Sequence, residues 1–150
     1  MKTIVALVDL SDLTFKVLKH AHALASAFNS EVIIVHVLGK APVVVDLGIA
    51  SPVLSEDPPE TVAEEQVEQL LEIRDSLIKF GVRASVVQLA DPKVASVLAE
   101  TKRLNADLII LGSHHHSTIY HMLVGSVAND VLKRAHCPVL VVPSDEDAAA

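Results

Sequence analysis

Five short apolar runs are spread along the chain, at residues 3–8, 32–38, 82–89, 108–111 and 139–142. The first run lacks the alternation of polar and apolar residues, which is typical of a strand buried on both faces of a parallel sheet. The segments between most of the runs are long enough to hold a helix. We therefore predict five strands joined largely by helices.

The connecting segments carry apolar residues at the spacing of amphipathic helices. A first helix begins at Ser11 or Asp12, either of which can cap it. A long second helix begins at Asp57 or Pro59 and ends at Lys79, with acidic residues early and basic residues late, as the helix dipole favours. The predicted buried positions are Leu13, Val17, Ala21, Leu24 and Phe28 in the first helix, Val67, Leu70, Leu71, Leu77 and Ile78 in the second, and Val94, Val97 and Leu98 in a third helix that follows Asp91-Pro92.

Strands that alternate with helices predict an open parallel α/β sheet, because parallel strands need crossover connections. We expect a single domain over residues 1–150, with a frayed tail at 144–150. Residues 39–59 break the pattern with four prolines, and their apolar residues predict a partly packed loop that covers a site or an interface. Ligands of such sheets lie beyond the C-terminal strand ends, where the strand order reverses.

The turn after the fourth run combines glycine, histidine and a helix start. Gly112 ends the run, three histidines follow at 114–116, and Gly125-Ser126 opens a helical pattern. Unpaired N–H groups at a helix start bind anions such as phosphate, and glycine allows a close approach of the backbone. The alternative is that the glycines serve ordinary turns and that Ser126 only caps the helix. Both interpretations stay open from these residues alone.

The chain resembles the universal stress protein family at this point. The nucleotide-binding members of that family carry a glycine, two residues, a second glycine, nine residues, and then Gly-Ser or Gly-Thr. Gly112 matches the first glycine, and Gly125-Ser126 match the final pair. The segments IVALVDLS near the start, VIIVHV at 32–37 and AHCPVLVV at 135–142 also match, so the resemblance covers nearly all of the chain.

The resemblance implies a Rossmann-like sheet of order 3-2-1-4-5 with helices on both faces, in which the first and fourth strands meet at the ligand crevice. It implies a ligand that is ATP, or AMP or ADP, with Mg²⁺ as a further candidate. In the family the aspartate that matches Asp9 contacts adenosine, whereas its position alone also suits a turn or cap residue. The implied binding residues are Leu7, Val8, Asp9 and Val37 around the adenosine, and Leu111, Gly112, His115, Gly125, Ser126 and Val127 around the ribose and phosphates.

The sequence departs from the family pattern at three positions. Leu10 stands where a glycine is common, and His115 replaces the middle glycine of the loop. His115 adds bulk beside the phosphates, so it either blocks a triphosphate or donates a hydrogen bond to it. His116 stands where Arg or Lys is common. Because imidazoles gain charge at acid pH, we expect any nucleotide affinity to rise between pH 8 and pH 6.

Composition excludes several classes of protein. A net charge of −7 argues against a nucleic-acid partner, and no apolar run approaches the length of a membrane span. The start of the chain does not resemble a signal peptide. The lone cysteine, Cys137, fits a reducing cytoplasm and is expected to be a small buried side chain, not a nucleophile.

The histidines allow a metal site as an alternative. His114, His115, His116 and His121 carry the imidazoles that bind Zn²⁺ or Ni²⁺, but adjacent side chains diverge and a solvated loop is the favoured interpretation. His20 and His22 are expected at the surface or its boundary, and His36 is expected to be a core histidine with a hydrogen-bond partner. We therefore predict no metal site.

Catalytic motifs are absent from the sequence, which has neither a nucleophile elbow nor a Walker lysine. The leading hypothesis is therefore a cytoplasmic stress protein that binds an adenine nucleotide as a signal, with at most slow hydrolysis. The resemblance implies a homodimer formed through the last strand, and the client protein is unknown. The alternatives are a protein-interaction module of the same fold with its pocket closed by His115, and a weak ATPase.

Overall fold

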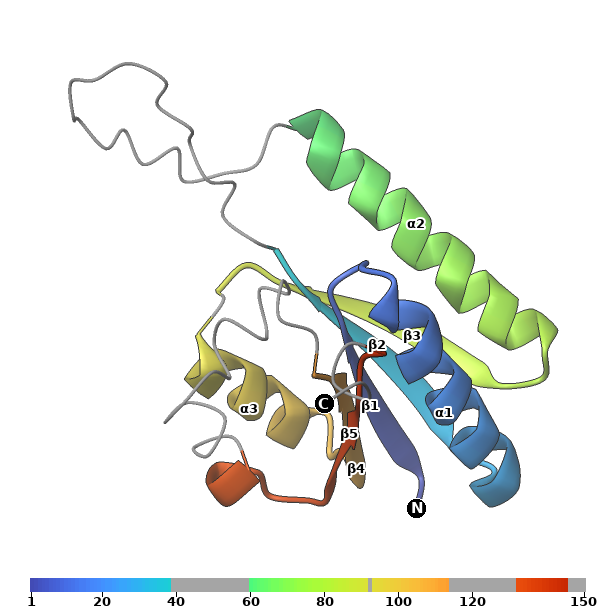
Figure 1. Cartoon of the computed structure of the whole chain (residues 1–150), viewed down its shortest axis with the longest axis vertical. Helices are drawn as coiled ribbons and strands as arrows, with labels where there is room; N and C mark the ends of the chain where they lie inside the picture. Colours follow the sequence, from blue (N-terminus) through green and yellow to red (C-terminus); the bar gives the residue numbers. More distant parts are fainter. Residues whose placement is uncertain (39–59, 92, 114–131, 146–150) are drawn as a thin grey trace.

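The computed structural model describes residues 1–38, 60–91, 93–113 and 132–145. Its centre is a five-stranded parallel sheet of order β3-β2-β1-β4-β5, which confirms the predicted fold class and order (Figure 1). The bounds of the strands lie within two residues of the apolar runs. The strands are β1 (Thr3–Val8), β2 (Glu31–Val37), β3 (Arg83–Leu89), β4 (Leu108–Gly112) and β5 (Val139–Val142).

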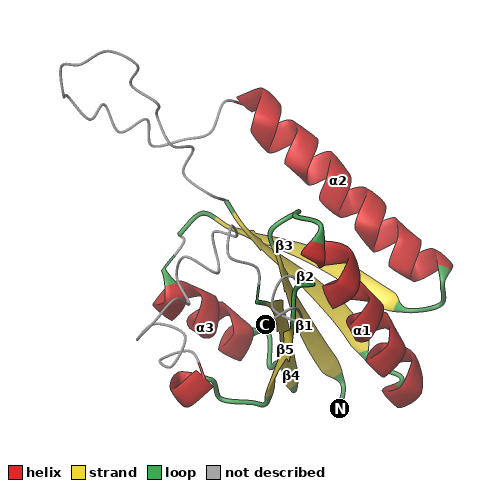
Figure 2. Cartoon of the chain, viewed as in Figure 1, coloured by secondary structure: helices red, strands yellow, loops and turns green. Residues whose placement is uncertain are grey.

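Helices cover both faces of the sheet, as Figure 2 shows. Helix α1 (Leu13–Phe28) and helix α2 (Glu60–Lys79) lie on one face, and α3 (Val94–Arg103) lies on the other. Each face has its own aliphatic core, because successive side chains of a buried strand point to opposite sides. On β1, Ile4, Ala6 and Val8 belong to the core under α1 and α2, whereas Val5 and Leu7 belong to the core under α3.

The predicted helix faces are confirmed near their centres and wrong at their margins. Leu13, Val17 and Ala21 of α1 and Leu70 and Leu77 of α2 are buried, and Val97 of α3 is buried with Val94 and Leu98 packed beside it. The corrections concern Phe28, Val67, Leu71 and Ile78, which are exposed large apolar side chains. Phe28 is the last residue of α1. Val67 and Leu71 line a small open pocket beside Val86 and Gln88 of β3, so they lie near the sheet without being covered.

The N-terminal end of β1 is tied to the start of β4 through one carboxylate. Asp107 Oδ2 accepts hydrogen bonds from the backbone N of Lys2 at 2.6 Å and of Thr3 at 2.9 Å. These bonds, first that of Lys2, hold the pKa of Asp107 below its ordinary value, because they favour the ionised form. The pairing of Ile4 with Leu108 follows directly from this register.

Three predicted features lie outside the described residues: the proline-rich loop at 39–59, the start of a fourth helix at Gly125-Ser126, and most of the tail at 144–150. Within the described part of the chain, no helix is both long enough and apolar enough to cross a membrane.

Candidate functional site

The C-terminal ends of three central strands lie side by side. Val8 of β1 pairs with His36 of β2, and Ala6 of β1 pairs with Ile110 of β4. The parallel register therefore places the ends of β1, β2 and β4 at one level of the sheet. The strand order reverses here, because β2 lies on one side of β1 and β4 lies on the other.

Five of the predicted binding residues lie at these strand ends together with Asp9. Leu7, Val8, Val37 and Leu111 are buried, and Gly112 and Asp9 are partly exposed. The structure thus brings together the four residues predicted around the adenosine and the first two of those predicted around the ribose and phosphates. The remaining predicted residues, His115, Gly125, Ser126 and Val127, lie outside the described part of the chain.

Asp9 organises the turn between β1 and α1. Its Oδ1 atom accepts hydrogen bonds from Ser11 N at 3.0 Å, Ser11 Oγ at 2.6 Å and Thr14 Oγ1 at 3.3 Å. Asp12 makes no capping hydrogen bond with its side chain, and the Ser11 hydroxyl is turned to Asp9. The predicted cap position is therefore confirmed at Asp12, but neither the side chain of Asp12 nor that of Ser11 makes a capping hydrogen bond to the helix.

The other carboxylate oxygen of Asp9 is available to a ligand. Among the described residues, Oδ2 takes part in no hydrogen bond, although the carboxylate is only partly exposed. A carboxylate that is fixed through one oxygen and open through the other suits a donor such as a ribose hydroxyl or an amino group. Ser11 and Thr14, which hold it in place, were missed by the sequence analysis because their role depends on the fold of the turn.

Leu10 follows Asp9 in a left-handed backbone conformation, with φ at +61°. Glycine is common at this position in the family that the sequence resembles, and a left-handed residue with a Cβ costs about 1–2 kcal/mol. The side chain of Leu10 packs against the core under α1 and α2, which offsets part of this cost. Asp9 therefore stays at the strand end although Leu10 stands in place of a glycine, and the backbone of Leu10 is strained.

His36 lies behind this edge, on the α1 and α2 face of the sheet. It is 2% exposed, and its Nδ1 atom makes no hydrogen bond within the described residues. The expectation of a core histidine with a partner is thus correct for burial and wrong for the partner. Burial lowers the pKa of His36, and the charge of Asp9 opposes this effect. His36 is therefore held as a neutral imidazole behind the carboxylate.

Gly112 is needed for packing between β4 and α1. A Cβ atom built on it would lie 2.4 Å from Cδ2 and 2.8 Å from Cγ of Leu13. The absence of a side chain at the end of β4 therefore lets the first turn of α1 approach the strand. The role that the structure shows for Gly112 is this close approach of α1.

Cys137 packs against the core under α3 and is a free thiol. Burial raises its pKa, and the charge of Asp107 adds to this effect, so the thiolate needed for nucleophilic chemistry is disfavoured. In the described ranges no group of three or more His, Cys, Asp or Glu side chains is placed to hold a metal ion, and the 114–116 histidines lie outside these ranges.

An open parallel sheet with helices on both faces, whose strand order reverses at β1, defines the doubly wound class of proteins; ligands of this class bind beyond the C-terminal strand ends at that reversal. Within this class, the chain belongs to the universal stress protein family, whose family model matches residues 1–143. Universal stress protein MJ0531 of Methanocaldococcus jannaschii is 33% identical to it over 141 residues, which cover 94% of this chain and 81% of that protein.

Solved structures of the family share the fold. The structure of protein MJ0577 gives a TM-score of 0.73 at 26% identity, with 96% of each chain covered. A universal stress protein in complex with cAMP gives 0.63 at 24% identity, with 95% of this chain and 96% of that chain covered. One from Archaeoglobus fulgidus in complex with dAMP gives 0.63 at 22% identity, with 94% and 96% covered. The last two likenesses show the fold alone.

Proposed function

We propose that this universal stress protein binds an adenine nucleotide at the C-terminal edge of β1, β2 and β4, as a regulatory ligand. The observation that carries the proposal is the Asp9 carboxylate, which is fixed through Oδ1 by three hydrogen bonds and open through Oδ2. Two solved proteins of the same fold are complexes with cAMP and dAMP, which supports an adenine nucleotide as the ligand class.

In this proposal the adenosine lies against the strand ends. Leu7 and Val8 line the base, the backbone of Val37 contacts it, and Asp9 accepts a hydrogen bond from the ribose or the base. Leu111 is assigned to the ribose, as in the family pattern. The phosphates are assigned to the loop that contains Gly112, His115, Gly125, Ser126 and Val127, as in the family pattern. ATP, ADP and AMP are the candidate ligands, and a Mg²⁺ ion bound with ATP would neutralise phosphate charge.

The nucleotide acts in our proposal as a signal and not as a substrate. Binding would change which protein contacts the chain makes, with a client protein as the receiver.

We place the protein in the cytoplasm, which suits a single free cysteine. We also propose a homodimer through β5, because this strand forms an edge of the sheet and Val141 is exposed on it.

Isothermal titration calorimetry with ATP, ADP, AMP and cAMP tests the proposal. We expect binding by the wild type and a loss of affinity of about tenfold or more in Asp9→Ala, because a hydrogen bond to a charged group contributes about 1.5–3 kcal/mol. Asp9→Asn keeps an acceptor oxygen for Ser11 and Thr14, so it separates loss of the ligand contact from loss of the turn.

Asp75→Ala is the matched control, since Asp75 is an exposed carboxylate on α2 that pairs only with the neighbouring Arg74 within the described residues. Thermal unfolding followed by circular dichroism checks that each variant is folded at the titration temperature. Absence of binding by the folded wild type, or equal affinities for the wild type and Asp9→Ala, would reject the proposed site.

A further inference from the structure

An apolar groove of about 530 Å³ runs between α1 and α2, on the outer side of the sheet. One wall includes Phe15 and Leu18 of α1. The other includes Ile73 and Leu77 of α2 and Phe80, the residue directly after α2. The rings of His22 and Phe80 meet edge to face at this groove, with centroids 6.1 Å apart. The groove is separate from the strand-end site that is described above.

Two of the three phenylalanines of the chain flank this groove and face solvent. The exposed fraction is 76% for Phe15 and 71% for Phe80. The chain has few aromatic residues, so their concentration at one groove is informative. Exposed apolar surface that is rimmed by polar residues is a mark of an interaction site.

The two walls of the groove carry opposite charge. Helix α1 holds Lys19 and Lys16, which pairs with Asp145, and it has no acidic residue, whereas α2 holds six acidic and two basic residues. Lys19 and Glu72 line the groove from opposite sides. A surface that is basic on one side of an apolar groove and acidic on the other complements a copy of itself that is turned by 180°.

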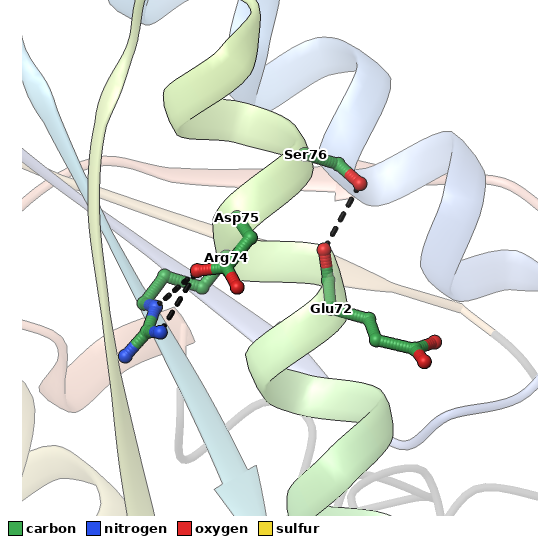
Figure 3. A network of polar contacts seen from close by, with 4 residues as sticks. All are labelled: Glu72, Arg74, Asp75 and Ser76. Atoms are coloured by element: carbon green, nitrogen blue, oxygen red, sulfur yellow. Dashed lines mark hydrogen bonds and ion pairs between the residues drawn. The ribbon is translucent and has the colours of Figure 1, made fainter.

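The two charged side chains that line the groove are unpaired within the described residues. Within the described residues, neither the ammonium of Lys19 nor the carboxylate of Glu72 forms an ion pair or hydrogen bond. Figure 3 shows the Glu72 carboxylate directed away from the pair of Arg74 and Asp75, while Ser76 Oγ donates only to the backbone oxygen of Glu72, at 2.9 Å. Lys19 and Glu72 are therefore both free to pair with another molecule.

We propose that the groove between α1 and α2 is a homotypic interface, in which α1 of one copy packs on α2 of a second copy about a twofold axis along the groove. Lys19 of each copy then pairs with Glu72 of the other, and the four phenylalanine rings are buried between them. Because a phenylalanine buries about 150–250 Å², these four rings would contribute about 600 Å², which is roughly half of a small specific interface. Leu18, Ile73 and Leu77 supply further apolar contact.

This interface differs from the β5 edge that we propose for the homodimer. It lies on the helices that cover β1, β2 and β3, whereas β5 is the strand at the far edge of the sheet. The two contacts use separate surfaces of the chain and can therefore form together. Their tests are independent of nucleotide binding, which is measured by titration of the strand-end site.

Disulfide trapping between two kinds of chain tests the interface directly. Cys137 is first replaced by Ser, and Lys19→Cys and Glu72→Cys are made on separate chains. We expect a mixture of these chains, under mild oxidation with copper phenanthroline, to give at least about fivefold more cross-linked dimer than either chain alone, since close approach raises the effective thiol concentration. Lys102→Cys mixed with Glu72→Cys is the matched control, because Lys102 is an exposed lysine on α3, behind the sheet.

Charge reversal gives a second readout by sedimentation equilibrium. All chains carry Val141→Glu, which places a charge on the β5 edge and leaves the groove to act alone. We expect Lys19→Glu and Glu72→Lys each to weaken association by about tenfold, because each replaces two attractive pairs with two repulsive ones. The chain with both reversals should recover to within about threefold of its parent, since the twofold arrangement restores both pairs.

The interface is rejected if the Lys19→Cys and Glu72→Cys mixture cross-links no better than the α3 control, or if the double reversal fails to recover. An association that is unchanged by both single reversals also rejects it, and would assign the groove to a different kind of occupant. Phe80→Ser on the Val141→Glu background should weaken association without lowering nucleotide affinity.

Discussion

Asp9 has different roles for its two carboxylate oxygens. Oδ1 closes the turn between β1 and α1 through Ser11 and Thr14, and Oδ2 remains available to a ligand. Behind it, the neutral imidazole of His36 lies at the same strand ends with Nδ1 unpaired in the described structure. A ligand that binds Asp9 therefore acts next to a buried titratable group.

His36→Gln tests the protonation state of this buried histidine. Because burial lowers the pKa of His36 in the folded state, protons bind preferentially to the unfolded chain. This contribution to the free energy of unfolding is complete above the unfolded pKa of about 6.5 and is lost as the pH falls from there toward the folded pKa. Between pH 7.5 and pH 5.5, the wild type should lose up to about 1.4 kcal/mol that His36→Gln does not lose.

Urea unfolding at the two pH values measures this difference. His20→Gln, at an exposed position of α1, is the matched control and should keep the pH dependence of the wild type. If His36→Gln and the wild type lose the same stability on acidification, the histidine is not held neutral in the fold.

At the scale of the elements, Gly112 sets the distance between β4 and α1. Leu13 occupies the space that a Cβ atom on Gly112 would need. Strand ends and the first turn of α1 are therefore packed closely around the proposed site. A change in this spacing would reach Asp9 through the β1–α1 turn.

Gly112→Ala should lower the free energy of unfolding by about 1–3 kcal/mol, because an added methyl group in a packed core forces side chains and backbone to shift. Denaturant unfolding measures the loss. The double variant Leu13→Ala with Gly112→Ala should be more stable than the sum of the two single changes predicts, since each makes room for the other. A fully additive double variant would mean that Gly112 and Leu13 do not compete for the same space.

The sequence predicted the positions of the strands and helices better than it predicted which helix residues are buried. Apolar runs located all five strands, and helical spacing located Leu13, Val17, Leu70 and Leu77 as core residues. The same spacing could not separate Leu70 from Leu71, because both lie on an apolar side of α2 and only contact with the sheet decides which is buried. Phe28 is a similar case at the end of a helix.

At the scale of the whole molecule, the strand order came from the family resemblance, and the order in turn brought the ends of β1 and β4 together. Asp9 and Gly112 are about a hundred positions apart in the sequence, so spacing alone could not pair them. The hydrogen bonds of Asp9, the unpaired Nδ1 of His36 and the charged walls of the α1–α2 groove depend on side-chain geometry, which a pattern of residue types does not contain.

The central claim, an adenine nucleotide at the C-terminal edge of β1, β2 and β4, is tested most directly by NMR spectroscopy of the ¹⁵N-labelled protein during titration with ATP. We predict that the largest amide shifts will lie at Asp9, Leu38 and Ser113, which surround the three strand ends, and that Asp9→Ala will abolish them at the same nucleotide concentration. Shifts confined to other parts of the chain, such as the groove between α1 and α2, or no shifts at millimolar ATP, would contradict the claim.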